Sequence, residues 1–509
     1  DAIKEIDEFV VTYNITAKER RLLLYKRQLY TKTKNSRGYP KSVKKINHGN
    51  NKIIISILHR NKEILGYDKA TGNYILYSLL KKRFKSLDND INFLDGINPK
   101  DLLFLSISTD GKDMLASVRT GDHTAKIMLR RYIAKDQRWS RWNTIDEMNP
   151  GSWNSYGNFT SDSRAVLFSS NIDKDNGLDI YITSREHSGK WSAPFKLAGV
   201  NTLLDEYSLF LHPDGETLYF SSNGIKGMGG FDVYAGKLKV NENKFLLSGI
   251  INIKTFNTFR NEKTPLFVDL QGKNAFLNFS VANDNFLYMS RKIILHPFAV
   301  SFFDGHVFDK KNKKPISNAN VKIVKLGKKE LRGAMERNTD ADGSFGISLR
   351  HNSKYIVSIS AKGYLYYKKY ISVKKQHLVK RNFYIKKGEI KKGYSFVANN
   401  IYFDTGSAVL RRNSFAELHN IYNFLIKNPG VSIEISGYTD NVGTYEYNME
   451  LSVKRALSIA TYLEKKGIKK KRLVARGFGF TKSVASNLSE AGRQKNRRVE
   501  VIVTGSVNN

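Results

Sequence analysis

The chain has 509 residues, which exceeds what one hydrophobic core usually organises, so three or four domains are expected. A net charge of +37 predicts an anionic partner, surface or polymer. Cysteine is absent, which excludes disulfides, thiolate metal sites and cysteine nucleophiles.

The sequence contains no apolar run near the ~18 residues of a membrane-spanning helix, so no transmembrane segment is expected. The chain opens with Asp1 rather than Met, which favours removal of an export signal. Basic residues are scattered in doublets, without a groove-reading helix or an aromatic RNA motif. Nucleic acid is therefore not expected as the anionic partner.

Residues 1–40 mix apolar positions such as Ile6, Phe9 and Val10 with many charges, and they match no repeat. The pattern predicts a helical N-terminal arm. Two roles for it remain open, a partner-binding arm and a helix packed on the next domain.

An internal repeat organises the next segment, 41–300. The phrases STDGKDMLASV, TSDSRAVLFSS and HPDGETLYFSS place Asp110, Asp162 and Asp214 at steps of 52 residues, and Trp139 and Trp191 repeat that step. Several short strands per repeat at this period are typical of propeller blades. The phrases, GMGGFDVY above all, resemble the WD-like repeats of TolB-type propellers. We expect a β-propeller of five or six blades, with the aspartates forming turns rather than a calcium or catalytic site.

Residues 301–390 lack the 52-residue repeat and contain the phrases GHVFDKKNKKPISNANVKIV and NTDADGSFGISL. These phrases resemble the carboxypeptidase regulatory-like domain, a small β-sandwich that implies a spacer or adhesion role without peptidase residues. From Lys310 to Lys392, 23 Lys or Arg stand against 5 Asp or Glu. Either a well-solvated surface or a docking face for an acidic polymer or protein fits this excess. The resemblance is carried by Gly305, Pro315, Ala319, Val321, Thr339, Asp342, Gly343, Phe345, Gly363 and Tyr364.

Residues 395–509 read as alternating strands and helices, beginning with the strand IYFD at 401–404. Val431, Ile433 and Ile435 alternate as a strand, and two helical stripes predict core positions. With RLVARGFGF and RRVEVIVTG, the pattern predicts an α+β sandwich whose helices cover one sheet face. The stripes are Phe415, Leu418, Tyr422 and Leu425, then Leu451, Leu457, Ala460 and Leu463.

This last segment resembles the C-terminal domain of OmpA, and also peptidoglycan-associated lipoprotein and the MotB tail. The phrases YFD, GYTDNVG, LSVKRA, RGFG and GRQKNRRVEV carry the resemblance. It implies binding of the diaminopimelate stem peptide of peptidoglycan, which carries an amino group and a carboxylate on one short side chain.

The resemblance implies five ligand-binding residues: Asp404, Asp440, Asn448, Arg455 and Arg498. Asp440 is expected to accept the ammonium group and Arg455 to bind the carboxylate in a bidentate geometry that Lys cannot reproduce. Asn448 would bind ligand or tie the loop. Two other readings stay open: Arg497 and Arg498 as surface partners of Glu500 or Asp404, and Asp440 as a helix N-cap.

Enzyme signatures are missing from the sequence, which has no G-x-S-x-G elbow, no H-E-x-x-H pair and ten scattered His. We therefore expect a non-enzymatic protein without cofactor or metal, a periplasmic tether joining peptidoglycan to an envelope protein complex. The domain order resembles Bacteroidetes envelope proteins, some of which serve type IX secretion or gliding motility at the outer membrane. The alternative is a soluble basic protein that recruits an acidic partner or glycan, with wall binding secondary.

Overall fold

The computed structural model describes most of the chain between Val43 and Ser506, and the expected arm at 1–40 lies outside the described residues. Undescribed residues are 1–42, 46–51, 59–62, 69–72, 79–82, 88–93, 95, 134–135, 137, 174–176, 187–188, 228–229, 242–243, 258–262, 282–283, 292–294, 327–334, 389–391, 399–400, 405, 412–413 and 507–509.

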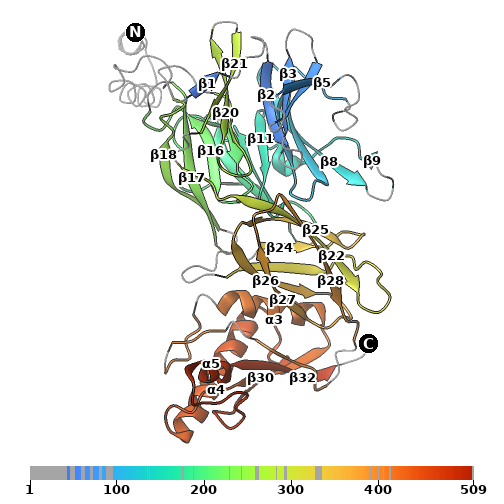
Figure 1. Ribbon diagram of the computed structural model, residues 1–509, viewed down its shortest axis with the longest axis vertical. Helices are drawn as coiled ribbons and strands as arrows, with labels where there is room; N and C mark the ends of the chain where they lie inside the picture. Colours follow the sequence, from blue (N-terminus) through green and yellow to red (C-terminus); the bar gives the residue numbers. More distant parts are fainter. Residues whose placement is uncertain are drawn as a thin grey trace. The chain divides into compact units, whose positions relative to one another are not determined.

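The chain, drawn in Figure 1, divides into two compact units. The first comprises Asp1–Asp304, Gly346–Asn352 and Val373–Val379. The second comprises Gly305–Phe345, Ser353–Ser372 and Lys380–Asn509.

Five antiparallel sheets follow one another in the first unit. The first contains β2 (Lys52–Leu58), β3 (Glu63–Asp68), β4 (Asn73–Ser78) and β5 (Arg83–Leu87). The second contains β6 (Leu102–Ile107), β7 (Asp113–Gly121), β8 (Thr124–Ile133), β9 (Arg138–Trp139) and β10 (Asn143–Thr144), followed by the 3-10 helix η2 (Asp146–Met148). The third contains β11 (Asn154–Phe159), β12 (Ala165–Ser170), β13 (Asp179–Ser184) and β14 (Phe195–Lys196). The fourth contains β15 (Glu206–Leu211), β16 (Thr217–Ser222), β17 (Asp232–Asn241) and β18 (Lys244–Asn252). The fifth contains β19 (Leu266–Val268), β20 (Ala275–Val281), β21 (Asp284–Ser290) and β1 (Val43–Lys45).

The first strands of these sheets form a ring of contacts. β2 contacts β6, β6 contacts β11, β11 contacts β15, β15 contacts β19, and β19 contacts β2. The early strand β1 pairs with β21 and so completes the sheet made from the far end of this segment. Stacked aromatic side chains such as Phe104 and Phe267, 6.0 Å apart, come from strands of this ring. We refer to this arrangement as the five-sheet domain.

The repeated aspartates have the turn role that the sequence predicts. Asp110, Asp162 and Asp214 each accept a hydrogen bond from the backbone N–H two residues further on, at 3.0, 3.2 and 2.9 Å. A shared irregularity also follows the 52-residue step, because β11 shifts register after Ser155 and β15 shifts after Tyr207. The sequence repeat therefore corresponds to a repeated sheet structure.

Glu206 is a buried carboxyl group of the five-sheet domain, bound by Ser222 and Thr202, and burial raises its pKa from 4.5 to about 7. The folded state keeps a proton that the unfolded chain releases. The contribution of Glu206 to stability is therefore fully present below pH 4.5 and is lost as pH rises through 7, by on the order of 3 kcal/mol. We expect Glu206→Gln to stabilise the domain at pH 8 but not at pH 4.5, in denaturant titrations at both values. Equal effects at both would contradict this, and exposed Asp146→Asn is the control.

A β-sandwich follows. One sheet has β22 (Val300–Asp309) between β25 (Ser344–Arg350) and β28 (Leu378–Ile385), and the other has the order β24 (Met335–Asn338), β23 (Asn320–Lys325), β26 (Ser353–Ser360), β27 (Tyr367–Val373). The structure explains why glycine stands at position 305, one of the predicted signature residues. A Cβ at this position would collide with the ring of Phe345. The close approach of backbone and ring therefore requires glycine.

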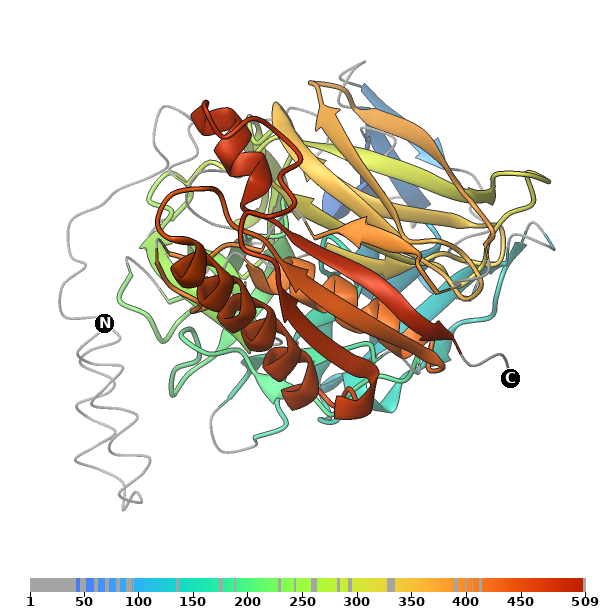
Figure 2. The ribbon, with the colours of Figure 1, turned by 90° about the horizontal axis from the view of Figure 1, so that it is seen from below.

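The C-terminal domain is a four-stranded sheet with helices. The sheet order is β29 (Ser395–Val397), β32 (Val499–Ser506), β30 (Val431–Gly437), β31 (Leu473–Gly477), with β30 and β31 parallel and the other pairs antiparallel. The helices are α3 (Phe415–Lys427), α4 (Tyr445–Lys465), η4 (Lys470–Arg472) and α5 (Glu490–Asn496). The long helix α4 runs beside the sheet in Figure 2. Val431, Ile433 and Ile435 share one hydrophobic cluster with both α3 and α4.

Two expectations for this domain were wrong in detail. The first strand is Ser395–Val397, whereas the predicted strand at 401–404 has only an isolated bridge from Phe403 to Leu410. Leu457 is 50% exposed rather than buried, because the buried face of α4 runs through Leu451, Ile459 and Leu463 at steps of about one or two turns.

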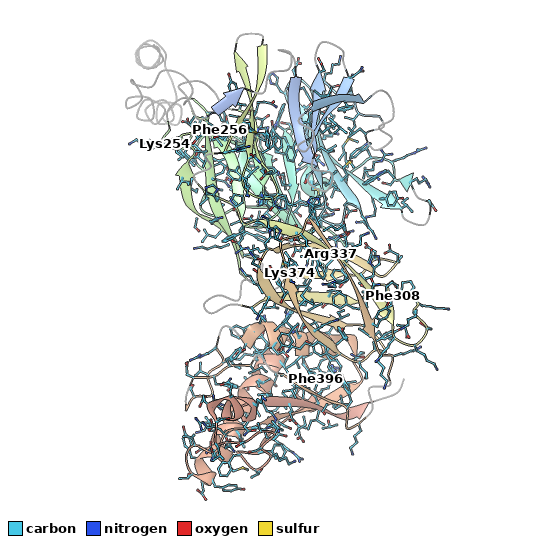
Figure 3. All side chains as sticks on the ribbon, in the orientation of Figure 1. Lys254, Phe256, Phe308, Arg337, Lys374 and Phe396 are labelled. Atoms are coloured by element: carbon cyan, nitrogen blue, oxygen red, sulfur yellow. The ribbon has the colours of Figure 1, made fainter. Side chains whose placement is uncertain are left out.

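Within the second unit, the sandwich and the C-terminal domain share side-chain contacts. Phe396, labelled in Figure 3, has its ring 5.1 Å from that of Tyr366 on the sandwich and 5.5 Å from that of Phe424 on α3. The two domains are thus packed together rather than joined only through the chain.

Candidate functional site

The candidate site begins at Asp440, directly after β30. One of its carboxylate oxygens accepts a hydrogen bond from the backbone N–H of Val442 at 3.1 Å. The helix N-cap is Thr444 and not Asp440, since the Thr444 side chain accepts from the N–H of Tyr447 at 3.2 Å. The N-cap reading of Asp440 was therefore wrong, and its second oxygen is available to a different partner.

Asn448 fixes the loop between Asp440 and α4. Its side chain is buried and donates to the carbonyl oxygens of Val442 and Thr444, at 2.9 and 3.1 Å. Of the two roles open for Asn448, the structure has the loop-tying one.

Asn448→Asp is expected to loosen this loop, because a carboxylate of the same shape cannot donate to two carbonyls and places charge against them. The cost should be about 1–3 kcal/mol, as for a buried group that loses its partner. Faster hydrogen exchange of the amides at 442–444 would show it. Asn441→Asp, an exposed change of equal charge in the same loop, is the control; equal exchange in both variants would contradict the tying role.

Arg455 lies on α4 and is only 8% exposed. Its Nε donates to the carbonyl of Ser407 at 3.0 Å, and Nη2 lies 3.4 Å from the carbonyl of Asp404. Desolvation lowers the pKa of Arg455, while the nearby charges of Tyr447 and Asp440 oppose that shift. Within the described part of the chain, this guanidinium is bonded to main-chain carbonyls and to no carboxylate.

Arg497 also belongs to the candidate site. The sequence analysis did not include this residue among the ligand-binding ones. Its Nη1 is 2.5 Å from the second oxygen of Asp440, and its Nη2 is 2.6 Å from Glu490 on α5. The phrase NRRVEV offers two adjacent arginines, and residues entering a strand alternate between faces, so only one can reach Asp440. The sequence analysis favoured Arg498, whereas the structure places Arg497 against Asp440.

Arg498, the arginine that the resemblance favoured, lies elsewhere. It donates to Glu500 at 2.8 Å and stacks 3.8 Å from the ring centre of Tyr438, with its side chain 8% exposed. Asp404 also differs from its expected role: its side chain is 61% exposed and pairs with Arg411, and only its carbonyl reaches Arg455. The structure therefore brings together Asp440, Asn448, Arg455 and Arg497.

This arrangement suits a small zwitterion. Arg455 offers a desolvated guanidinium that no carboxylate of the described residues binds, which favours a carboxylate ligand in a bidentate geometry. Asp440 offers a carboxylate close by, held in place by Val442 and Arg497. Because Arg497 already pairs with Asp440, an ammonium group of a ligand would share the carboxylate with this guanidinium.

Two stretches of the chain match known protein families. Residues 402–497 match the OmpA family, and residues 303–392 match the CarboxypepD_reg-like domain. The chain carries an OmpA-like domain. Asp440, Asn448, Arg455 and Arg497 all lie inside its matched residues.

Individual relatives match about a fifth of this chain. Outer membrane porin F of Pseudomonas fluorescens is 39% identical over 101 residues, covering 20% of this chain and 31% of that protein. The peptidoglycan-associated lipoprotein of Buchnera aphidicola is 35% identical over 114 residues, covering 22% and 63%. The crystal structure of the peptidoglycan-associated lipoprotein from Burkholderia pseudomallei is 33% identical, covering 20% of this chain and 87% of that chain, with a TM-score of 0.20. The chain thus spans less than two thirds of the length of the two curated relatives, porin F and the Buchnera lipoprotein.

The described residues contain neither a candidate membrane-spanning helix nor a candidate metal site. No helix there combines the length and the apolar composition that crossing a membrane requires. No three His, Asp or Glu side chains of the described residues are grouped as a metal site needs.

Proposed function

We propose that this protein is a non-catalytic tether whose OmpA-like domain binds the diaminopimelate stem peptide of peptidoglycan. Asp440 and Arg455 contact the ligand, and Asn448 holds the loop between them. Asp404 contributes its main-chain carbonyl to the position of Arg455. Arg497 orients Asp440, whereas the resemblance had placed Arg498, and not Arg497, among the residues that line the ligand pocket.

One observation carries this proposal: among the described residues, the buried guanidinium of Arg455 bonds to main-chain carbonyls and to no carboxylate, and it lies near the charge of Asp440. An uncompensated buried cation is costly unless a ligand supplies the missing anion. The diaminopimelate side chain carries that anion together with an ammonium group for Asp440. The name peptidoglycan-associated lipoprotein, borne by two relatives of the domain, points to the same polymer.

The test is co-sedimentation of the full-length protein with diaminopimelate-type sacculi at low and high salt. Wild-type protein is expected to sediment at both, whereas Asp440→Ala should lose the salt-resistant fraction. Glu464→Ala, an exposed change of equal charge on α4, is the matched control. Salt-resistant binding by Asp440→Ala equal to wild type would refute the site and leave non-specific charge as the explanation. Release of soluble fragments from the sacculi would refute the non-catalytic role.

We further propose that the five-sheet domain is a five-bladed β-propeller that binds an envelope protein complex. Five sheets in chain order, the ring of first strands and the pairing of β1 with β21 support the propeller. The order of domains supports a periplasmic place in a Bacteroidetes-type envelope, at the outer membrane, in secretion or gliding. Pull-down of the envelope complex by full-length Asp440→Ala would separate partner binding from wall binding.

A further inference from the structure

Exposed apolar side chains surround the loop that leads into α4. Val442 is 64% exposed, Tyr445 is 49% exposed and Tyr447 is 47% exposed. Single exposed apolar residues need no explanation, but three within six residues beside a charged site form a patch.

A second loop completes this patch. Phe480 follows β31, and its ring meets that of Tyr445 edge-on, with centres 6.0 Å apart and planes at 85°. Such an edge-to-face contact fixes the orientation of the tyrosine ring while leaving much of it in solvent. We call Tyr445 and Phe480 together the aromatic shelf.

The shelf is fixed next to Asp440 by the main chain on both sides. The N–H of Thr439 donates to the carbonyl of Gly479 at 2.9 Å. This hydrogen bond joins the residue before Asp440 to the residue before Phe480. Gly479 in turn donates to the Ser452 hydroxyl at 3.0 Å on α4. Tyr445 starts that helix, five residues after Asp440. Two rigid attachments thus position the shelf against the charged site.

We propose that the aromatic shelf binds the apolar face of a pyranose ring in the glycan strand that carries the stem peptide. This inference rests on the proposed function, because the zwitterionic end of the same ligand would lie on Asp440 and Arg455. A peptide backbone crossing the shelf would need hydrogen-bond partners, which Tyr445, Phe480 and Val442 side chains offer poorly. A sugar ring covers an aromatic ring with its C–H groups and keeps its hydroxyls in water. A rigid tyrosine supplies that contact area at a low entropic cost.

The experiment compares two soluble ligands by calorimetry with the full-length protein: a disaccharide–tripeptide containing diaminopimelate, and the same tripeptide without sugars. Tyr445→Ala is expected to weaken the disaccharide–tripeptide roughly tenfold, as for a contact residue of moderate weight. Its affinity for the bare tripeptide should stay at the wild-type value. Tyr445→Phe should retain both affinities, because it keeps the ring.

Controls separate this proposal from the proposed function. Tyr370→Ala removes another tyrosine of the second unit, 57% exposed and located on β27, and should change neither affinity. Asp440→Ala should weaken both ligands, and if it weakens neither, the proposed function itself fails. If Asp440→Ala weakens both while Tyr445→Ala weakens neither or weakens both equally, only the sugar-binding shelf is overturned.

Discussion

Replacing Arg455 by Lys is expected to weaken binding of the protein to a diaminopimelate tripeptide roughly tenfold to a hundredfold. The charge stays, but the planar fork that binds a carboxylate with two parallel hydrogen bonds is lost. Hydrogen bonds to charged groups contribute about 1.5–3 kcal/mol each, and every 1.4 kcal/mol is a factor of ten in affinity. Lys would also lose the bond to the carbonyl of Ser407. Calorimetry on the full-length variant measures the change.

Arg472→Lys is the matched control for this variant. Among the described residues, Arg472 also bonds to main-chain carbonyls, those of Val431, Leu425 and Asn428 at 2.7–2.9 Å, and burial likewise lowers its pKa. It precedes β31, whereas the site lies beyond the far end of that strand. We expect Arg472→Lys to reduce stability without changing affinity. Equal losses of affinity in both variants would mean that Arg455 acts through the fold and not through the ligand.

Patterns of alternation predicted much of the OmpA-like domain. Val431, Ile433 and Ile435 form a strand whose apolar side faces both helices, because one face of the sheet must exclude water. The prediction that Leu457 is buried was wrong, because an apolar residue at an approximately helical spacing does not have to face the core. The short strand at 395–397 was missed because three residues carry too little periodicity to be read.

The charged site was predictable only in part. Motif spacing located Asp440 and Arg455, since the family pattern fixes both in sequence. The choice between Arg497 and Arg498 depends on how the chain enters β32 after α5, which leaves one side chain against Asp440 and the other against Tyr438. Likewise, Asp404 contacts Arg455 through its main-chain carbonyl. Such a contact does not depend on the residue type, so the sequence cannot indicate it.

A buried ion pair inside the second unit was also beyond prediction. Lys368 on β27 of the sandwich lies 3.2 and 3.3 Å from the two carboxylate oxygens of Glu417 on α3, with side chains 13% and 2% exposed. Asn420 adds a hydrogen bond to the same carboxylate at 3.3 Å. Glu417 and Asn420 lie on the polar side of α3, which would face solvent in an isolated domain. The sandwich covers that side and supplies the matching cation.

Lys368→Ala is therefore expected to destabilise the second unit by ~3–5 kcal/mol, because it leaves the carboxylate of Glu417 buried without its cation. The double variant Lys368→Ala with Glu417→Leu should recover much of that loss, since it removes the uncompensated charge as well. Denaturant unfolding, together with hydrogen exchange of α3 amides, measures both. Lys369→Ala, on the exposed side of the same strand, is the control.

The comparison of these variants decides how the OmpA-like domain is held. If Lys368→Ala costs no more than Lys369→Ala, then water reaches Glu417 and the two domains of the second unit separate freely. If the cost is large and the double variant recovers it, the interface is closed to water, and the sandwich fixes the OmpA-like domain in one orientation. In the proposed tether, force would then pass through a rigid pair of domains instead of a flexible joint, because separating them would expose a desolvated charge pair.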